Sequence, residues 1–281
     1  MEGSLSTNEL TIGVSEVRRI SRAVQESYGF DFSNYALSSF RRRLERFMRL
    51  QKITSVSVLI ERMIKDPVFF NFFLKEITVN VTEMFRDSSF WREMRDKLLP
   101  ELNKRYRIKI WHAGCSSGEE VYTMLIMLSE AGMLDKVRIT ATDINSDVLK
   151  VAQSGLIDAK KMELNQKNYS SFLGNSSLTH YFKREDNTMR IDPRLLRPVT
   201  FQEHDLAREG SIGGFDLVLC RNVMIYFNKD LQNRVLSTFS SSLARGSYLA
   251  IGTMESLDGT LVKAQFAKGN FRENIYRKTS Q

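Results

Sequence analysis

The sequence has few of the side chains that bind metals or form disulfides. It contains 2 cysteines and 3 histidines in 281 residues. Cys115 and Cys220 lie far apart in no metal-binding spacing, and the histidines are too scattered to form a site. These counts predict no bound metal, and they fit the reducing environment of the cytoplasm.

Long apolar runs are also absent. No stretch approaches the roughly 20 apolar residues of a membrane-spanning helix. Residues 1–11 are polar and lack the core of a signal peptide. We therefore expect a cytoplasmic protein that does not insert into a membrane.

The overall composition is typical of a soluble globular protein, with 42% hydrophobic and 26% charged residues. A chain of 281 residues can bury a sizeable core, most simply as one large domain with a small one. The net charge of +8 suits a nucleic acid, an anionic membrane surface or an acidic protein as partner, and it does not choose among them.

The most informative motif is a predicted strand that ends in a loop of small residues. The apolar run at 108–113 precedes this loop, and the acids Glu119 and Glu120 then open a helical pattern. A second apolar run, at 137–142, ends at Asp143. In open α/β sheets, nucleotide-like cofactors bind in the first crevice of this kind, and an acid after the second strand is placed to accept hydrogen bonds from a ribose.

The composition of this loop limits the cofactor. The loop lacks the Lys-Ser/Thr pair of a P-loop and the full glycine pattern of a dinucleotide site. Its acids would repel a pyrophosphate but suit a cationic ligand, and S-adenosylmethionine carries an ammonium, a sulfonium and a ribose without a phosphate. The residues alone leave a second interpretation open, an α/β fold without a nucleotide whose small residues serve packing.

Further strands and helices alternate downstream, which indicates a largely parallel sheet. Residues 199–206 predict a strand that ends at Asp205. Residues 215–222 predict a buried strand that terminates in Arg221 and Asn222. Both polar ends would lie at the carboxyl edge of the sheet, where open sheets bind ligands.

The last third also predicts a helix and an insert. We expect a helix from about 228 to 243, closed by Arg245 and Gly246, before a strand at 248–252. Residues 164–198 interrupt the alternation and predict a small β-hairpin with a turn at 185–187.

Residues 1–79 are predicted to be helical, because their apolar side chains recur at helical spacing and no segment alternates like a strand. On one of these helices Arg42, Arg46 and Arg49 share the face opposite the apolar one. This face is either a solvated surface or a docking face for an acidic partner. The aromatic residues lie on the apolar face, so stacking on single-stranded nucleic acid is poorly supported.

Four short motifs occur in an order and spacing that resemble a known family. They are NVTEMFR at 80–86, SSGEE at 116–120, TDI at 142–144 and CRNVMIYF at 220–227. Over nearly its whole length, the chain resembles the bacterial chemotaxis receptor glutamate O-methyltransferases of the CheR type.

The resemblance implies an α/β fold, in which a Rossmann-like S-adenosylmethionine-dependent methyltransferase domain with a small antiparallel β insert follows an all-helical N-terminal domain. It divides the chain into a receptor-docking helical domain at 1–79, a linker at 80–88 that contributes to the cofactor site, and a methyltransferase domain at 89–281 with the insert at about 164–198.

The resemblance also implies a cofactor site. Glu120 would hold the methionyl ammonium and Asp143 the ribose, while the linker closes over the cofactor. Glu119 stays ambiguous because it could instead cap its helix. The implied contacts of S-adenosylmethionine, and of its product S-adenosylhomocysteine, are Asn80, Thr82, Arg86, Glu120, Asp143, Asp205, Leu206, Arg221 and Asn222.

The implied acceptor is a receptor glutamate, which is already ionised at neutral pH because its ordinary pKa is about 4.3. The reaction therefore needs no general base, and Arg86 and Tyr226 would act as the catalytic residues by orienting the carboxylate. The partner would be the cytoplasmic domain of a chemoreceptor, contacted by the arginine face of the helical domain.

Two departures from the family pattern matter. The family often has a histidine after the glycine equivalent to Gly252, and residues 253–256 contain none. This departure keeps open a regulatory module that senses the cofactor without transferring a methyl group. The hairpin turn at 184–189 is short and lacks the glycines of relatives that grip a receptor tail peptide, so we expect no such tether, and a monomer.

A further alternative is a nucleic-acid methyltransferase, which the basic charge would suit. Against it, the chain has no Asn/Asp-Pro-Pro-aromatic motif, and neither cysteine follows a proline.

Overall fold

The computed structural model describes residues 11–78, 82–173 and 177–280. They form two compact units. The first unit comprises residues 11–78 together with the segment Tyr226–Leu231, and the second comprises the other described residues from 82 onward. Among the described helices, none is long and apolar enough to cross a membrane.

The first unit is helical, as the sequence predicts. Its helices are α1 (Val14–Tyr28), α2 (Leu37–Leu50), α3 (Val56–Lys65) and α4 (Pro67–Thr78). Helix α2 turns Phe40, Leu44, Phe47 and Met48 into the core of this unit, where each is at most 2% exposed. This burial confirms the predicted apolar face of the arginine-rich helix.

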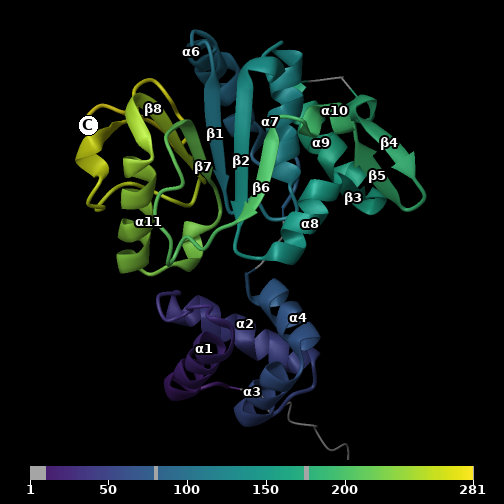
Figure 1. The fold of residues 1–281 in the computed structure, drawn as a ribbon, viewed down its shortest axis with the longest axis vertical. Coiled ribbons are helices and arrows are strands. Elements are labelled where there is room, and N and C mark those ends of the chain that lie inside the picture. The colour runs from purple at the N-terminus through teal and green to yellow at the C-terminus, as the bar shows by residue number, and fades with distance from the viewer. Residues whose placement is uncertain (1–10, 79–81, 174–176, 281) are drawn as a thin grey trace, which may run out of the picture. The chain divides into compact units, whose positions relative to one another are not determined.

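The second unit is organised around a seven-stranded sheet (Figure 1). Its spatial order is β6 (Val199–Glu203), β2 (Val137–Asp143), β1 (Ile108–Ala113), β7 (Phe215–Cys220), β8 (Leu243–Ile251), β10 (Ile275–Lys278) and β9 (Phe266–Ala267). The first five strands in this order pair with one another in parallel. Strand β10 pairs antiparallel with both β8 and β9. The predicted largely parallel sheet is confirmed.

The order of the strands creates a topological switch point between β1 and β7. From β1 the chain continues to β2 and then β6 on one side, whereas β7 and β8 lie on the other side of β1. The connections that leave β1 and β7 at their carboxyl ends therefore diverge and leave a crevice, the usual ligand position in open sheets.

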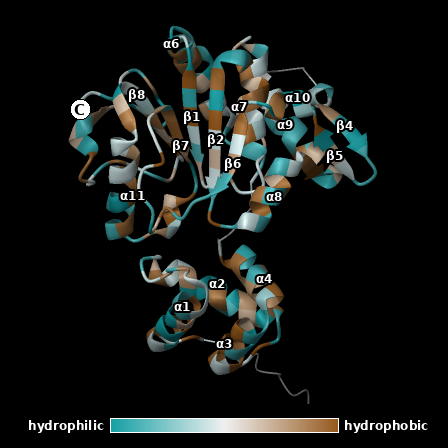
Figure 2. Cartoon of the chain, viewed as in Figure 1, coloured by the Kyte–Doolittle hydropathy of each residue, from teal (hydrophilic) through white to brown (hydrophobic). Residues whose placement is uncertain are grey.

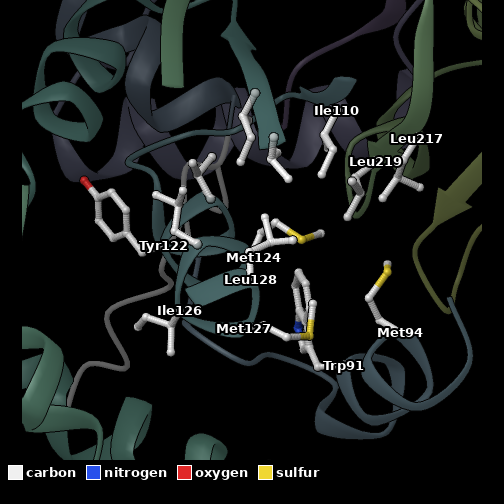
Figure 3. Close-up of a cluster of buried hydrophobic side chains, with 14 of the residues drawn as sticks. Trp91, Met94, Ile110, Tyr122, Met124, Ile126, Met127, Leu128, Leu217 and Leu219 are labelled. Carbon is white, nitrogen blue, oxygen red and sulfur yellow. The ribbon is translucent and has the colours of Figure 1, made fainter. Parts of the chain in front are cut away.

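Helices and short turns complete the second unit. They are α5 (Ser88–Glu93), α6 (Leu99–Asn103), α7 (Glu119–Glu130), α8 (Ser146–Ser154), α9 (Met162–Leu173), α10 (Pro193–Leu196) and α11 (Lys229–Ser241), with a π-helical turn at Met94–Leu98. Helix α11 belongs to this unit from Gln232 onward. In Figure 3, Met124 and Leu128 of α7 lie in one apolar cluster with Trp91 of α5 and Leu219 of β7. This packing fixes α7, and with it the loop that precedes the helix.

The predicted hairpin is present and belongs to a separate sheet of three strands. Strands β4 (Phe182–Glu185) and β5 (Thr188–Ile191) form the hairpin, and β3 (Leu156–Asp158) pairs with β5. Figure 2 shows this hairpin as hydrophilic at its tip, while the central strands of the large sheet carry many of the hydrophobic residues. The insert differs from its predicted bounds, because strand β3 lies before residue 164 and residues 164–173 are helical as part of α9.

The predicted end of the helix at about 228–243, which Arg245 and Gly246 were expected to close, is wrong. Helix α11 ends at Ser241, and Arg245 and Gly246 lie within strand β8. The pairing of β7 with β8 shifts register after Phe215, and Gly246 adopts φ 82°. The glycine therefore marks an irregularity inside a strand and does not close a helix.

Candidate active site

Two loops at the switch point pack tightly against each other. Gly114, the first residue after β1, adopts φ 78°, which L side chains rarely adopt. A Cβ atom at this position would lie 2.5 Å from a methyl group of Val223, in the loop that follows β7. Glycine is thus required both by the backbone and by the contact with the neighbouring loop.

Strained backbone gathers in the segments predicted to bind the cofactor. Six residues other than glycine have positive φ among those the structure describes. Four of them, Phe85, Asp87, Ser116 and Asn222, lie in the linker at 80–88, the loop after β1 and the loop after β7. Such conformations persist only where the surroundings enforce them, and they concentrate at binding and catalytic sites.

Glu120, in the first turn of α7, is the centre of a polar cluster. Its Oε2 accepts a hydrogen bond from Arg221 at 2.8 Å, and its Oε1 lies 3.3 Å from Nδ1 of His112. Burial would raise the pKa of Glu120, but the charge of Arg221 and the contact with His112 outweigh it and hold the pKa below its ordinary value. Glu120 is therefore an anion at neutral pH, and a carboxylate with two partners retains free lone pairs.

The carboxylate of Glu119 is already bound by side chains of the protein. Its side chain is 2% exposed, accepts a hydrogen bond from the Ser117 hydroxyl at 2.6 Å and pairs with the Lys161 ammonium at 2.8 Å. The ambiguity between the two acids is thereby reduced. Glu119 already has a cation, so Glu120 is the better candidate for the ammonium of a ligand.

Arg221 lies at the end of β7 and joins the linker to α7. Its side chain is 1% exposed and donates to Glu120 and to Asp87, each at 2.8 Å. It also reaches the backbone carbonyl of Arg86 at 3.3 Å and lies over the ring of Phe90, 4.1 Å from the ring centre. These contacts favour an indirect part for Arg221, which holds Glu120 and the linker in place.

Sequence reasoning does not find His112 as a member of this cluster, because no neighbouring motif separates it from an ordinary packed residue. The signal that could have drawn attention to His112 is its position as the last residue but one of β1, near the carboxyl edge of the sheet. Its Nε2 and the Nε of Arg221 are buried without a hydrogen-bond partner among the described residues. Buried polar atoms that lack a partner are uncommon and point to a missing polar ligand or water.

Asp143 ends β2 and is 8% exposed. Its Oδ2 accepts the backbone N–H of Ser116 at 2.9 Å, and its Oδ1 accepts that of Asn145 at 3.0 Å. Burial raises the pKa of this carboxyl, although the backbone donors oppose the rise. The carboxylate is thus held rigidly beside the loop after β1, as the ribose assignment requires.

The other predicted cofactor residues are found as follows. Asp205 follows β6, and burial raises its pKa. The preceding His204 donates its backbone N–H to the Asp143 carbonyl at 3.0 Å, so Asp143 and Asp205 follow neighbouring strand ends. Leu206 is buried, Thr82, Arg86 and Asn222 are half-buried, and Asn80 lies outside the described residues.

Tyr226 belongs to the first unit. Its ring lies under the guanidinium of Arg43, 3.7 Å from the guanidinium carbon, and its carbonyl accepts the Ala36 N–H at 2.8 Å. Arg43 is buried on the inner side of α2 and donates to the Ile77 carbonyl at 2.6 Å. The three arginines of the predicted docking face, Arg42, Arg46 and Arg49, are all exposed.

The arrangement suits S-adenosylmethionine. It offers an ionised carboxylate at the start of α7 for an ammonium and a buried carboxylate after β2 for ribose hydroxyls, and the loop between β1 and α7 contains no lysine or arginine for a phosphate. The unpartnered atoms beside Glu120 leave room for additional polar contacts. A Rossmann-like sheet with these groups at its switch point defines the class of S-adenosylmethionine-dependent methyltransferases.

Comparison with known proteins identifies the family. Residues 80–272 match the family described as CheR methyltransferase, SAM binding domain, and residues 15–78 match its all-alpha domain. The chain belongs to the CheR methyltransferase family, and its cofactor is S-adenosylmethionine.

Individual relatives are similar over almost the whole chain. A Pseudomonas putida protein that carries the name of a methyltransferase, Cher3, is 38% identical over 264 residues, which cover 94% of this chain and 97% of the relative. Chemotaxis protein methyltransferases of Vibrio anguillarum and Listeria monocytogenes are 33% and 30% identical, and the matches cover 93% and 92% of this chain and 96% and 95% of the relatives.

Proposed function

We propose that this methyltransferase transfers the methyl group of S-adenosylmethionine to glutamate side chains in the cytoplasmic domain of chemoreceptors and forms glutamyl methyl esters. The observation that carries the proposal is the similarity to proteins named chemotaxis protein methyltransferases, which covers more than nine-tenths of this chain and of each relative. The chemistry of the site agrees with it, since the histidine of the Glu120 cluster is buried against that carboxylate and a carboxylate acceptor needs no general base.

The chain would contribute orientation and charge balance. S-adenosylmethionine supplies an electrophilic methyl group on a sulfonium when it is bound. Glu120 and Asp143 would hold the ammonium and the ribose, and Thr82 and Arg86 of the linker would cover the site. Arg86 would also supply a positive fork for a carboxylate without taking up a proton.

The decisive assay uses tritiated S-adenosylmethionine with receptor-containing membranes. We expect label in the receptor that alkali releases as volatile methanol, because esters hydrolyse in base. Label that is stable to alkali, or label found in added DNA or RNA, would contradict the proposal and favour a nucleic-acid or N-methyltransferase. Cofactor binding without any transfer would favour the regulatory module.

The arginine face of α2 is proposed as the receptor contact. Replacing Arg42, Arg46 and Arg49 together by alanine should raise the KM for receptor about fivefold at low salt, and less at high salt, because exposed charges act through screened attraction. The affinity for S-adenosylhomocysteine should not change. Steady-state kinetics across a salt series measures both effects.

A matched control removes the same charge from another helix of this unit. Arg18, Arg19 and Arg22 are exposed on α1, and their triple alanine variant should leave the KM for receptor near the wild-type value. Equal effects of the two variants would mean that only net charge matters and that α2 is no docking face.

Tyr226 is proposed to orient the acceptor carboxylate through its hydroxyl. Tyr226→Phe keeps the ring on which Arg43 stacks, so the fold should be preserved. We expect turnover to fall on the order of tenfold with an unchanged affinity for S-adenosylhomocysteine, since the hydroxyl would act in the reaction and not in cofactor binding. Wild-type turnover in this variant, or an equal loss in Tyr35→Phe, would reduce Tyr226 to a packing residue.

Three further features complete the proposed function. The protein would work in the cytoplasm as a monomer. The hairpin of β4 and β5 would serve as a second receptor contact that does not depend on a tail peptide, since its turn at Asp186 and Asn187 contains no glycine.

A further inference from the structure

Glu255 is a buried carboxylate outside the four motifs on which the family resemblance rests. It lies after β8 and is 7% exposed. Its Oε1 accepts the backbone N–H groups of Val223 at 3.0 Å and Met224 at 2.8 Å. One side chain therefore holds the loop after β7 from a segment more than thirty residues away.

The second carboxylate oxygen binds the same region. Oε2 accepts the N–H of Asn222 at 3.3 Å and that of Gly252 at 2.6 Å. None of the ion pairs between described residues includes Glu255. Backbone dipoles alone thus compensate the buried charge, and burial still raises the pKa of this carboxyl.

The loop after β7, which Glu255 holds through these hydrogen bonds, contains Asn222 with its left-handed backbone. Asn222 has φ 61°, a conformation that must be enforced by its surroundings. A Cβ on Gly252 would lie 2.9 Å from the Asn222 nitrogen, so no larger residue fits beneath it. Asn274 supports this arrangement from the other side, where its Nδ2 donates to the carbonyls of Gly252 and Glu255 at 3.0 and 2.8 Å.

The hydrogen bonds of Glu255 also affect the loop after β1, which contains Gly114. Val223, held by Glu255, is the residue whose methyl group occupies the space that Gly114 leaves free. A displaced Val223 would therefore press on the loop after β1 or open a gap beside it. Because interiors are close-packed, such a shift is transmitted and not absorbed.

We propose that Glu255 is a positioning residue for cofactor binding, which holds Asn222 and Val223 in the geometry that shapes the cofactor crevice. The proposal rests on the proposed contact between Asn222 and the cofactor. It gives a role to the stretch after Gly252, where the family pattern and this chain differ. A glutamine cannot replace the carboxylate, because it offers one acceptor oxygen and two donor hydrogens toward backbone N–H groups.

The test compares Glu255→Gln with the wild type as full-length proteins. Calorimetry with S-adenosylhomocysteine, carried out well below the melting temperature, should show a Kd raised about tenfold or more in the folded variant. Asn274→Ala should raise the Kd in the same direction but less. Since no receptor is present, the result does not depend on whether receptor glutamates are the acceptors.

A matched control separates positioning from general stability. Glu93 is also buried and accepts two backbone N–H groups, those of Arg272 and Glu273. It differs from Glu255 in that it pairs with Lys97 at 2.6 Å and that none of its hydrogen bonds to described residues goes to the loop after β7. Glu93→Gln should lower the melting temperature and leave the Kd within twofold of the wild type. If Glu255→Gln does not fold, Glu255→Asp, which keeps the charge on a shorter side chain, provides the same comparison. A folded Glu255 variant that binds S-adenosylhomocysteine like the wild type would overturn the proposal.

Discussion

Replacing Arg221 by methionine should lower the free energy of unfolding by about 3 kcal/mol and sharply weaken cofactor binding. Removing this guanidinium leaves the carboxylates of Glu120 and Asp87 without a cation, and the loss of a buried partner costs about 3–5 kcal/mol. The lower figure applies because these carboxylates are 19% and 30% exposed. Urea denaturation measures the stability, and calorimetry with S-adenosylhomocysteine measures the affinity.

An exposed arginine supplies the control for this experiment. Arg194 pairs with Asp192 at 2.6 Å but is 78% exposed. Arg194→Met should change the stability by less than about 1 kcal/mol, because surface pairs contribute little. Arg221→Lys should lie between the wild type and Arg221→Met, since one ammonium cannot span both carboxylates. Equal stabilities of Arg221→Met and Arg194→Met would show that the cluster around Glu120 is not held by this charge.

Replacing Asp143 by alanine should weaken the binding of S-adenosylhomocysteine by about 1.5–3 kcal/mol, the range for hydrogen bonds to a charged group. This loss corresponds to a Kd raised about 10- to 150-fold. Asp147, on the following helix, is half-exposed and pairs with Lys150, so Asp147→Ala is a matched control that should bind normally. Wild-type affinity in the Asp143 variant would refute the ribose assignment.

The raised pKa of Asp143 gives this prediction a pH dependence. Ribose hydroxyls donate to the carboxylate, so binding favours the ionised form. The affinity should therefore fall as the pH is lowered through the pKa of Asp143, which lies above its ordinary value of 3.8 because the group is buried. Glu120, whose pKa is lowered, should lose its charge only at a lower pH. Calorimetry from pH 7 downward follows the decline.

The parts of the fold that depend on local pattern could be predicted from the sequence. Apolar runs of strand length and the helical spacing of Phe40, Leu44 and Phe47 each reflect one face of one element. The helical N-terminal unit, the parallel sheet and the acids at its strand ends follow from such patterns. Gly246 was misread because a glycine after a helix and a glycine in a strand irregularity look alike in sequence.

The parts of the candidate site that depend on distant partners could not be predicted. Glu255 acts on backbone N–H groups of residues 222–224, and backbone donors leave no side-chain signature. His112 belongs to the site because its ring contacts Glu120, and the two residues come together only where strand β1 and helix α7 meet in the fold. Glu119 and Glu120 are identical in type, and their partners distinguish them. Lys161, forty-two residues away, pairs with Glu119, whereas Arg221, 101 residues away, pairs with Glu120.

The left-handed residues Ser116 and Asn222 have a consequence for efforts to make this enzyme more heat-stable. Both side chains are half-buried, so glycine at either position would release conformational energy without opening a cavity in the core. The other two left-handed residues differ, because Phe85 is fully buried in the apolar core and Asp87 pairs with Arg221, so glycine there would cost more stability than the released strain returns. A screen for thermal tolerance alone would therefore favour glycine at 116 and 222, while a looser loop would no longer present the cofactor contacts in advance. Selection for activity and selection for heat resistance should thus pull these two codons in opposite directions, and a useful library would keep them fixed and vary the surface instead.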